Sequence, residues 1–442
     1  MSIIDSRTTS LRHIMAGGLI LVGLLFQLLR LAGVPLDLST VSYAFWLAMG
    51  LLWWDLGKRN RRQATVLAGA GFIFLVLAWF QYDTDIDWPH ILDGNVYVVA
   101  MLVGVSFIGL IGSRQGHSPP SGNAITGRYG AASTLLGVHL LGAILNLSSV
   151  FIVGDRLSRY GNLTIPQLLA LNRGLSSVAL WSPFFASMGV VVTLAPDMQF
   201  RVILAFSLPL TLMAGVFTVF DLSHRFGLDN VPGFSLTPGS LLMPIIMASL
   251  VMLFHYGLTP ELSIVSIITF LLPAVAVTYN APQGVRWLVR RLRNHTIKRL
   301  PAMCGEISLF LCAGLFTQGL SAFINAATGN QWTLFTDFGP PQAAVSVLAI
   351  VASAVVGLHP IVGISVLASI LELEGSRQTL FAFVALSSWA IGNSVGPLSG
   401  INLSLQGRYG MSGSVMMRNN FGYAGAMTGV VIVFIFIMDA VL

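Results

Sequence analysis

Long apolar runs separated by short polar stretches fill almost all of this 442-residue chain. A helix needs about 20 apolar residues to cross the ~30 Å hydrocarbon core of a bilayer. About thirteen runs approach that length, and polar residues interrupt two or three of them. They are, roughly, 13–34, 40–56, 64–81, 95–113, 130–154, 165–196, 201–220, 239–258, 261–280, 303–326, 341–371, 378–405 and 420–442. The pattern predicts an all-α polytopic membrane protein with about 11 to 13 hydrophobic segments.

Composition and charge agree with this pattern. Hydrophobic residues make up 55% of the chain and charged residues 9%, whereas a soluble domain carries roughly 25% charged residues. The formal net charge of +6 comes from basic residues clustered in short loops. This clustering indicates membrane orientation and argues against a nucleic-acid partner. Cys304 and Cys312 form no metal-binding or disulfide pattern, so we expect no metal site and no resident cofactor.

The charged loops predict how the chain is oriented. Basic loops are enriched on the cytoplasmic side of a membrane. We therefore place the loop Lys58–Arg62 and the basic stretch Arg286–Arg299 in the cytoplasm, and the acidic loop Asp83–Asp93 on the opposite side. This predicts a multi-pass protein of the bacterial inner membrane with a cytoplasmic N-terminus.

Segment 165–196 is the least regular of the apolar runs. About five segments lie between Arg128 and Arg286, but two loops on the same side require an even number of crossings. The segment contains several polar residues and Pro183. Irregular backbone at membrane depth survives only where protein or a water-filled cavity satisfies it. We expect a re-entrant hairpin or a broken helix here; the alternative is an ordinary span beside a miscounted neighbour.

Two apolar stretches, Leu135–Phe151 and Val355–Leu371, align without gaps at a spacing of 220 residues. The identical pairs are Gly137 and Gly357, His139 and His359, Ile144 and Ile364, Leu147 and Leu367, and Ser149 and Ser369. Further along, Leu175-Ser176-Ser177 corresponds to Leu386-Ser387-Ser388, and a proline-containing polar break follows each. This shared order predicts two repeats; the alternative is that both halves merely share the composition of membrane helices.

The loop charges give the two repeats opposite orientations. The segment with His139 runs outward from the cytoplasmic side, whereas the segment with His359 runs inward. Inverted repeats are typical of secondary transporters, whose sites lie at paired broken helices near the membrane midplane. The predicted organisation is scaffold-like N-terminal helices in 1–120, transport repeat 1 in 121–235, connecting helices and a cytoplasmic basic loop in 236–300, and transport repeat 2 with the last helix in 301–442.

Polar side chains in the two repeats are the candidate ligands. Broken helices offer N–H groups to anions, and carbonyl, amide and hydroxyl oxygens to Na⁺. The candidate substrate-binding residues are Asn146, Ser148, Ser149, Arg173, Ser182, Asn393, Ser394 and Ser399. The candidate coupling-ion residues are His139, His359, Asn146, Ser149 and Asn402. Because acidic residues are almost absent from the repeat cores, we expect an anionic, carboxylate-like substrate.

Each candidate also has a purely structural interpretation. A serine in a helix often bonds back to its own backbone, and an arginine such as Arg173 can extend its charged head to the interface. A histidine can carry a proton near neutral pH, or it can bond a carbonyl as a neutral imidazole. The roles of His139 and His359 therefore stay open, although Pro360 must disturb the helix beside His359.

The layout of these breaks resembles the ion-transporter superfamily, which includes divalent anion/sodium symporters, TRAP large-subunit permeases and arsenite-type permeases. Asn146-Leu147-Ser148-Ser149 stands where sodium/dicarboxylate symporters carry a Ser-Asn-Thr tip. Ser182-Pro183 and Gly396-Pro397 stand where they carry proline-rich turns, and His359-Pro360 replaces the second tip. The resemblance spans about residues 125–420. It implies an elevator-type carrier coupled to Na⁺ or H⁺, with a small anionic substrate and a homodimeric assembly.

Other functions find less support in the sequence. A membrane enzyme of lipid-linked polysaccharide assembly, of polymerase or ligase type, has a similar number of spans but usually needs a large extracytoplasmic loop. The outer loops here are short, and no GxxxxGK[ST], HExxH or CxxC motif is present. A structural membrane protein without transport is a further alternative. The sequence predicts a secondary transporter rather than an enzyme, with a small-molecule substrate and membrane lipid as its partners.

Overall fold

The computed structural model describes residues 11–111, 125–236, 238–329, 335, 337–371 and 373–442. Across these residues the secondary structure is helical and no strand forms, apart from an isolated bridge between Thr126 and Pro232. Eight helices in this part of the chain are long and apolar enough to cross a membrane. The chain is therefore an all-α polytopic membrane protein, as the hydrophobic pattern predicts.

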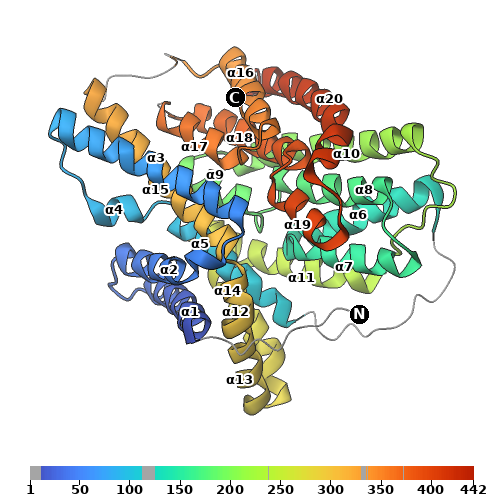
Figure 1. The fold of residues 1–442 in the computed structure, drawn as a ribbon, viewed down its shortest axis with the longest axis horizontal. Coiled ribbons are helices and arrows are strands. Elements are labelled where there is room, and N and C mark those ends of the chain that lie inside the picture. The colour runs from blue at the N-terminus through green and yellow to red at the C-terminus, as the bar shows by residue number, and fades with distance from the viewer. Residues whose placement is uncertain (1–10, 112–124, 237, 330–334, 336, 372) are drawn as a thin grey trace. The chain divides into compact units, whose positions relative to one another are not determined.

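The helices form two compact units, and each unit joins segments that are far apart in the sequence (Figure 1). Unit 1 comprises residues 1–116 and 261–332, and unit 2 comprises residues 117–260 and 333–442. This division differs from the predicted boundaries, because residues 301–332 cluster with the N-terminal helices rather than with the second repeat. The predicted boundary at residue 120 lies outside the described residues.

Unit 1 is held together by close contacts between helices of its two chain segments. Its helices are α1 (Leu11–Leu31), α2 (Leu38–Leu52), α3 (Lys58–Tyr82), α4 (Trp88–Leu92), α5 (Val96–Ser106), α12 (Ile264–Asn280), α13 (Val285–Asn294), α14 (Leu300–Ala302) and α15 (Cys304–Thr328). α3 packs along α15, and a Cβ placed on Gly319 of α15 would lie 2.3 Å from the Gly71 carbonyl oxygen of α3. Small residues of this kind let membrane helices pack backbone to backbone.

Unit 2 contains the same succession of elements twice. In each half, two pairs of a longer and a shorter helix are followed by one long helix. The first half is α6 (Gly127–Leu145), α7 (Ser148–Leu157), α8 (Ile165–Ser176), α9 (Ala186–Leu194) and α10 (Phe200–Arg225), after which comes α11 (Pro238–Leu253). The second half is α16 (Pro340–Val355), α17 (Pro360–Ser369), α18 (Ser376–Val395), α19 (Gly400–Tyr409) and α20 (Gly413–Asp439). This order of elements is the one expected for a repeat.

Equivalent elements of the two halves are separated by fewer residues than the gapless alignment predicts. α8 and α18 begin 211 residues apart, so Leu175-Ser176-Ser177 and Leu386-Ser387-Ser388 occupy equivalent places, as predicted. The alignment at 220 residues is wrong, because His139 lies inside α6 whereas His359 precedes the first residue of α17. Leucine-rich and isoleucine-rich helices match at several offsets, and the shared Gly-x-His was a coincidence of composition.

In both halves the first pair of helices folds back on itself. A Cβ on Gly137 of α6 would lie 2.5 Å from the Phe234 ring, and the guanidinium of Arg156 in α7 lies 5.4 Å from the centroid of the same ring. In the second half a Cβ on Gly363 of α17 would lie 2.9 Å from Ile350 Cγ1 of α16. The chain therefore reverses direction between α6 and α7, and again between α16 and α17.

Segment 165–196 is a broken helix, which is one of the two forms predicted for it. α8 continues through η5 (Ser177–Leu180), the chain is non-helical from Trp181 to Phe185, and α9 follows. The segment that folds back is instead 127–157, which the crossing count treats as a span. Its turn contains only Asn146 and Leu147, so the apolar pattern continues across it almost without interruption.

The equivalent broken helices of the two halves lie antiparallel. The side-chain amide of Asn420 donates both to Asn172, in α8 before the first break, and to the carbonyl of Ser394, near the end of α18. Beyond the end of the first broken helix, the Gln199 N–H donates to the hydroxyl of Thr379, near the start of α18, at 2.9 Å. Equivalent helices that run in opposite directions are the mark of an inverted repeat.

The glycine contact between α3 and α15 gives a stability prediction. In Gly319→Leu the new side chain must displace the backbone of α3, so we expect the free energy of unfolding to fall by about 3 kcal/mol, the upper end for overpacked cores. The matched control is Gly69→Leu, because a Cβ at Gly69 meets no atom within 4 Å; it should change stability by about 0.5 kcal/mol or less. Denaturant unfolding in mixed micelles measures both variants. Equal losses of unfolding free energy would contradict the close contact between α3 and α15.

Candidate functional site

Unit 2 interrupts its helices at four places, two in each half. Irregular backbone inside a membrane must be satisfied by protein groups or by water. At the first hairpin turn Asn146 adopts a φ of 51°, a left-handed conformation that is uncommon for a residue other than glycine. The hydroxyl of Ser149 donates to the Asn146 carbonyl at 2.8 Å, and the Ser149 N–H donates to the same oxygen at 3.0 Å. Of the predicted residues, Asn146 thus lies in the turn itself, Ser148 begins α7, and Ser149 in the first turn of α7 bonds back to Asn146.

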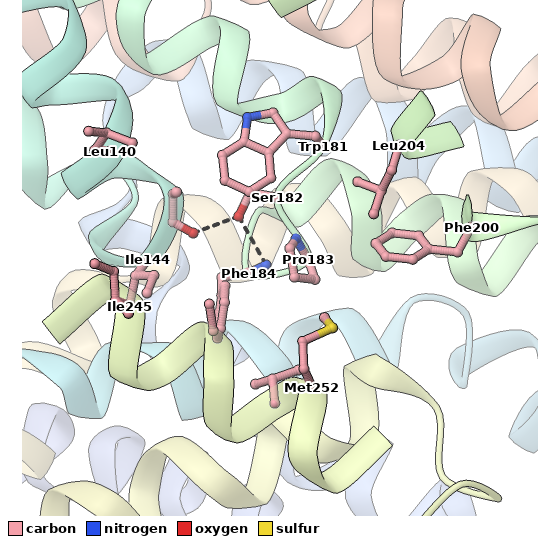
Figure 2. Close-up of a pocket in the computed structure, with 13 residues that line it drawn as sticks. Leu140, Ile144, Trp181, Ser182, Pro183, Phe184, Phe200, Leu204, Ile245 and Met252 are labelled. Carbon is pink, nitrogen blue, oxygen red and sulfur yellow. Dashed lines mark hydrogen bonds between the residues drawn. The ribbon is translucent and has the colours of Figure 1, made fainter. Parts of the chain in front are cut away.

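Ser182 joins the first helix break to the first hairpin turn. Its hydroxyl donates to the Ala143 carbonyl of α6 at 2.5 Å and accepts the Phe184 N–H at 3.2 Å. Figure 2 shows both bonds, with Ser182 between the end of α6 and the turn before α9. The hydroxyl of Ser187, one residue into α9, donates back across the break to the Ala179 carbonyl at 2.8 Å. The break therefore has a fixed shape and lies against the hairpin.

In the second half, His359 caps the short arm of the hairpin. Its Nδ1 accepts the N–H of Ile361 at 3.2 Å, and its ring meets the Trp389 ring edge to face with centroids 5.1 Å apart. Gly357, with a φ of 102°, forms the turn, and a Cβ there would lie 2.9 Å from Leu398 in the second break. The hairpin tip and the break are again in contact.

Ser399 and Asn402 hold the second break in place. The hydroxyl of Ser399 donates to the Asn393 carbonyl at 2.7 Å and accepts the Asn402 N–H at 3.4 Å. The side-chain amide of Asn402 donates to the carbonyls of Gly396 at 2.9 Å and Ser394 at 3.2 Å. These predicted residues are brought together, and each hydrogen bond satisfies backbone that the break would otherwise leave without a partner.

Arg173 is buried and fully engaged with other protein groups. It is 1% exposed, and its guanidinium donates to Asp221 at 2.7 Å, to the Asn420 side chain at 2.8 Å and to the Asn419 carbonyl at 3.2 Å. The Tyr423 ring covers it at 4.5 Å. This burial does not fit the interfacial Arg173 that was the structural alternative to the predicted substrate ligand. Its side chain connects α8 to α10 and α20. Protein groups therefore occupy the positions that a substrate carboxylate would take.

Asn172, the neighbour of Arg173, extends this network to the second break. Its amide donates to the Asn402 side chain at 2.7 Å, and its oxygen accepts from Asn420 at 3.3 Å. Asn172, Asn402 and Asn420 are all fully buried. The sequence analysis missed Asp221 and Asn420, although the polar pair Asn419-Asn420 inside an apolar helix was a visible signal.

His139 is bonded at both ring nitrogens. Nδ1 lies 3.1 Å from the Gly174 carbonyl and 2.9 Å from the Ser177 hydroxyl, and Nε2 accepts the indole N–H of Trp181 at 3.1 Å. A neutral ring with its proton on Nδ1 satisfies all of these partners. A second proton, on Nε2, would meet the indole N–H and break the bond to Trp181. His139 thus fixes the position of Trp181, the first residue of the first break.

A cavity of about 230 Å³ lies at this first break. Its wall is apolar and comes from α6, the turn 181–184, α10 and α11, with Leu140, Ile144, Phe184 and Met252 among its lining residues (Figure 2). Ser182 is a lining residue as well, but its hydroxyl is already bonded to protein. The cavity can therefore accept a small apolar group beside the break.

Some buried polar atoms between the two halves have no hydrogen-bond partner. They are the Asn393 side-chain oxygen and the hydroxyls of Ser176, Ser387 and Ser388. α8 and α18, which carry them, pack against each other. The Ser394 hydroxyl, by contrast, bonds back to the Ile391 carbonyl at 2.7 Å, as serines in helices often do. Among the described residues, no cluster of three or more His, Cys, Asp or Glu side chains could hold a metal ion.

The network around Arg173 generates a prediction about stability. Asp221→Leu leaves a buried cation without its carboxylate, so we expect a loss of about 3 to 5 kcal/mol. Arg173→Met/Asp221→Leu removes both charges and should be clearly more stable than the single variant. Asp155→Asn, which breaks an ion pair with Arg408 at side chains 43% and 51% exposed, should cost about 1 kcal/mol or less. Thermal unfolding in detergent compares the three, and a double variant as unstable as Asp221→Leu would overturn this interpretation.

Comparison with known proteins finds similarity among solved structures. No protein-family model matches the chain, and no curated protein matches it either. Among solved structures, the chain is similar to the crystal structure of the YdaH transporter of Alcanivorax borkumensis, which is described as having an unusual topology. The two share 14% sequence identity over 84% of this chain and 97% of that one, with a TM-score of 0.46. This likeness is too low to carry a function from one protein to the other.

Proposed function

We propose that this protein is a secondary transporter that moves a small organic anion across the bacterial inner membrane, coupled to Na⁺ or H⁺. One observation carries the proposal: unit 2 contains two antiparallel copies of a hairpin whose tip touches a broken helix. Secondary transporters build their sites from such paired discontinuous helices. The resemblance of the tips and breaks to the ion-transporter superfamily supports the same function.

The chemistry of the tips and breaks favours an anion. No Asp or Glu occurs in the two hairpin turns or the two breaks. Three helices that begin at these places, α7, α9 and α19, start with N–H groups; α17 begins with Pro360, and His359 already accepts the Ile361 N–H. The first N–H groups of a helix have no partner within the helix and carry partial positive charge. A carboxylate would be stabilised by these groups without a buried arginine, and Arg173 is in any case occupied by Asp221.

The apolar cavity at the first break favours a solute that also has a hydrocarbon part. Its walls would exclude water from such a group, while the adjoining α9 N-terminus offers backbone donors to a carboxylate. For the coupling ion, the unpartnered oxygen of Asn393 is the kind of ligand that Na⁺ takes from broken helices. These features together support a carboxylate-like substrate and an oxygen-lined cation site near α18.

Uptake into proteoliposomes tests the transport function. With the full chain reconstituted, we expect one of a panel of radiolabelled carboxylates to accumulate above equilibrium when a Na⁺ or pH gradient is imposed, and to leave when an ionophore collapses that gradient. Gly396→Ala should abolish uptake, because its Cβ would lie 2.7 Å from the Gly392 carbonyl in the second break. Gly400→Ala is the matched control, since a Cβ there meets no atom within 4 Å. If the carboxylate only equilibrates across the membrane, whichever gradient is imposed, coupled transport is contradicted.

A second prediction tests whether His359 couples a proton to transport. Protonation of His359 at Nδ1 would remove the acceptor that caps α17, which links a proton to the hairpin tip. If the driving ion is H⁺, we expect His359→Asn, which keeps a capping side chain, to lose pH-driven accumulation but to keep substrate exchange. His359→Ala should lose both activities. Unchanged pH-driven uptake by His359→Asn would leave His359 with only its capping role.

A further inference from the structure

α13 in unit 1 separates apolar from basic side chains along its length. The ten residues of this helix, VRWLVRRLRN, contain four arginines and four aliphatic residues. Val285, Leu288, Val289 and Leu292 follow a spacing of three and four residues and therefore share one face. Arg286, Arg290 and Arg293 repeat with the same spacing on the flank beside it. The sequence analysis treats this stretch simply as a basic loop.

The apolar face of α13 is only partly covered, with Leu288 and Leu292 half-buried. None of its residues is buried, and Val285 and Val289 are 75% and 56% exposed. The helix packs on the neighbouring turns η7 (Ala281–Gln283) and η8 (His295–Arg299). An exposed aliphatic face next to a basic flank needs a partner that is itself both apolar and acidic.

The three flanking arginines have no carboxylate partner among the described residues. No ion pair joins Arg286, Arg290 or Arg293 to an acidic side chain in this part of the chain. Arg291 differs, because it donates to Asn280 at 3.2 Å and lies 4.6 Å from the centroid of the Trp287 ring. One arginine thus anchors the helix to the end of α12, and the other three remain available to an external anion.

The position of α13 in the chain fixes it at the membrane surface. The candidate span Ile264–Gln283 ends two residues before α13 begins, and the candidate span Cys304–Thr328 follows it. Gly284, with a φ of 98°, forms the turn between the first span and α13. Helical structure continues through η8 and α14 to Ala302, and α13 itself, with four arginines in ten residues, cannot cross the hydrocarbon core. It must therefore lie close to the lipid headgroups.

We propose that α13 lies in the membrane interface and binds anionic phospholipid. The aliphatic face would enter the boundary between headgroups and acyl chains, and the three free arginines would contact headgroup phosphates, as interfacial amphipathic helices do. Basic residues beside a membrane each contribute about 1 kcal/mol of attraction to anionic lipid. Loss of all three should therefore weaken anionic-lipid binding on the order of 100-fold. This inference rests on the membrane fold and not on the transport function.

Spin labels on the full chain test the placement of α13. In nanodiscs containing phosphatidylglycerol, a nitroxide at Val289→Cys, on a background without Cys304 and Cys312, should collide with oxygen dissolved in the bilayer. A nitroxide at Arg293→Cys should collide instead with an aqueous nickel reagent. If the label at position 289 is accessible only to the aqueous reagent, α13 faces water or a soluble partner and the proposal fails.

Thermal unfolding tests the lipid preference separately. We expect phosphatidylglycerol to raise the unfolding midpoint relative to phosphatidylcholine, and high salt to reduce that rise. Arg286→Gln/Arg290→Gln/Arg293→Gln should lose most of the rise, whereas the matching triple lysine variant should keep it. Lys58→Gln/Arg61→Gln/Arg62→Gln, in the other basic loop, controls for the loss of three charges. An equal rise in the wild type and the triple glutamine variant of α13 would overturn the proposal.

Discussion

The hydrogen-bonding needs of an interrupted helix inside a membrane govern the structure of unit 2. Each break frees backbone groups that hydrocarbon cannot satisfy. Ser182, Ser399 and His359 accept N–H groups of the turns, and Asn402 donates to two carbonyls. In the first half the Ser182 hydroxyl also bonds Ala143 and so holds the break against its hairpin, and in the second half the His359 ring packs against Trp389 of α18. The residues that make the irregular backbone tolerable therefore also assemble the candidate site.

The two halves of unit 2 share their order of elements but not their chemistry. Where α8 lies near the end of α18, a charged and amide-rich network joins four helices through Arg173 and Asn420. Asn420 is the eighth residue of α20, and the eighth residue of α10 is Ser207, whose buried hydroxyl has no hydrogen-bond partner. One end of the antiparallel pair is thus joined through a buried ion pair, and the other through hydrogen bonds of Gln378 and Thr379 to residues 197 and 199.

Much of the fold could be predicted from the sequence, but the correct alignment of the two repeats could not. Hydropathy identified the membrane class, and Pro183 with nearby serines identified the first broken helix. The cluster Asn146–Ser149 was predicted as a helix tip, but the count of spans missed that the chain reverses there, because apolar residues continue on both sides of it. Side-chain roles were harder still, since Arg173 could pair with a substrate or with protein until Asp221, 48 residues away in the sequence, was found beside it.

The Arg173 network also bears on how the chain enters the membrane. Arg173 is synthesised 48 residues before Asp221 and 247 residues before Asn420. An arginine at membrane depth is costly until a partner neutralises it. Asp221 belongs to the same repeat and reaches the membrane first, whereas the amide partners arrive only with the last helix. Asp221 therefore has two roles. It neutralises Arg173 while only the first half of unit 2 has been inserted, and it is then part of the network that includes Asn420.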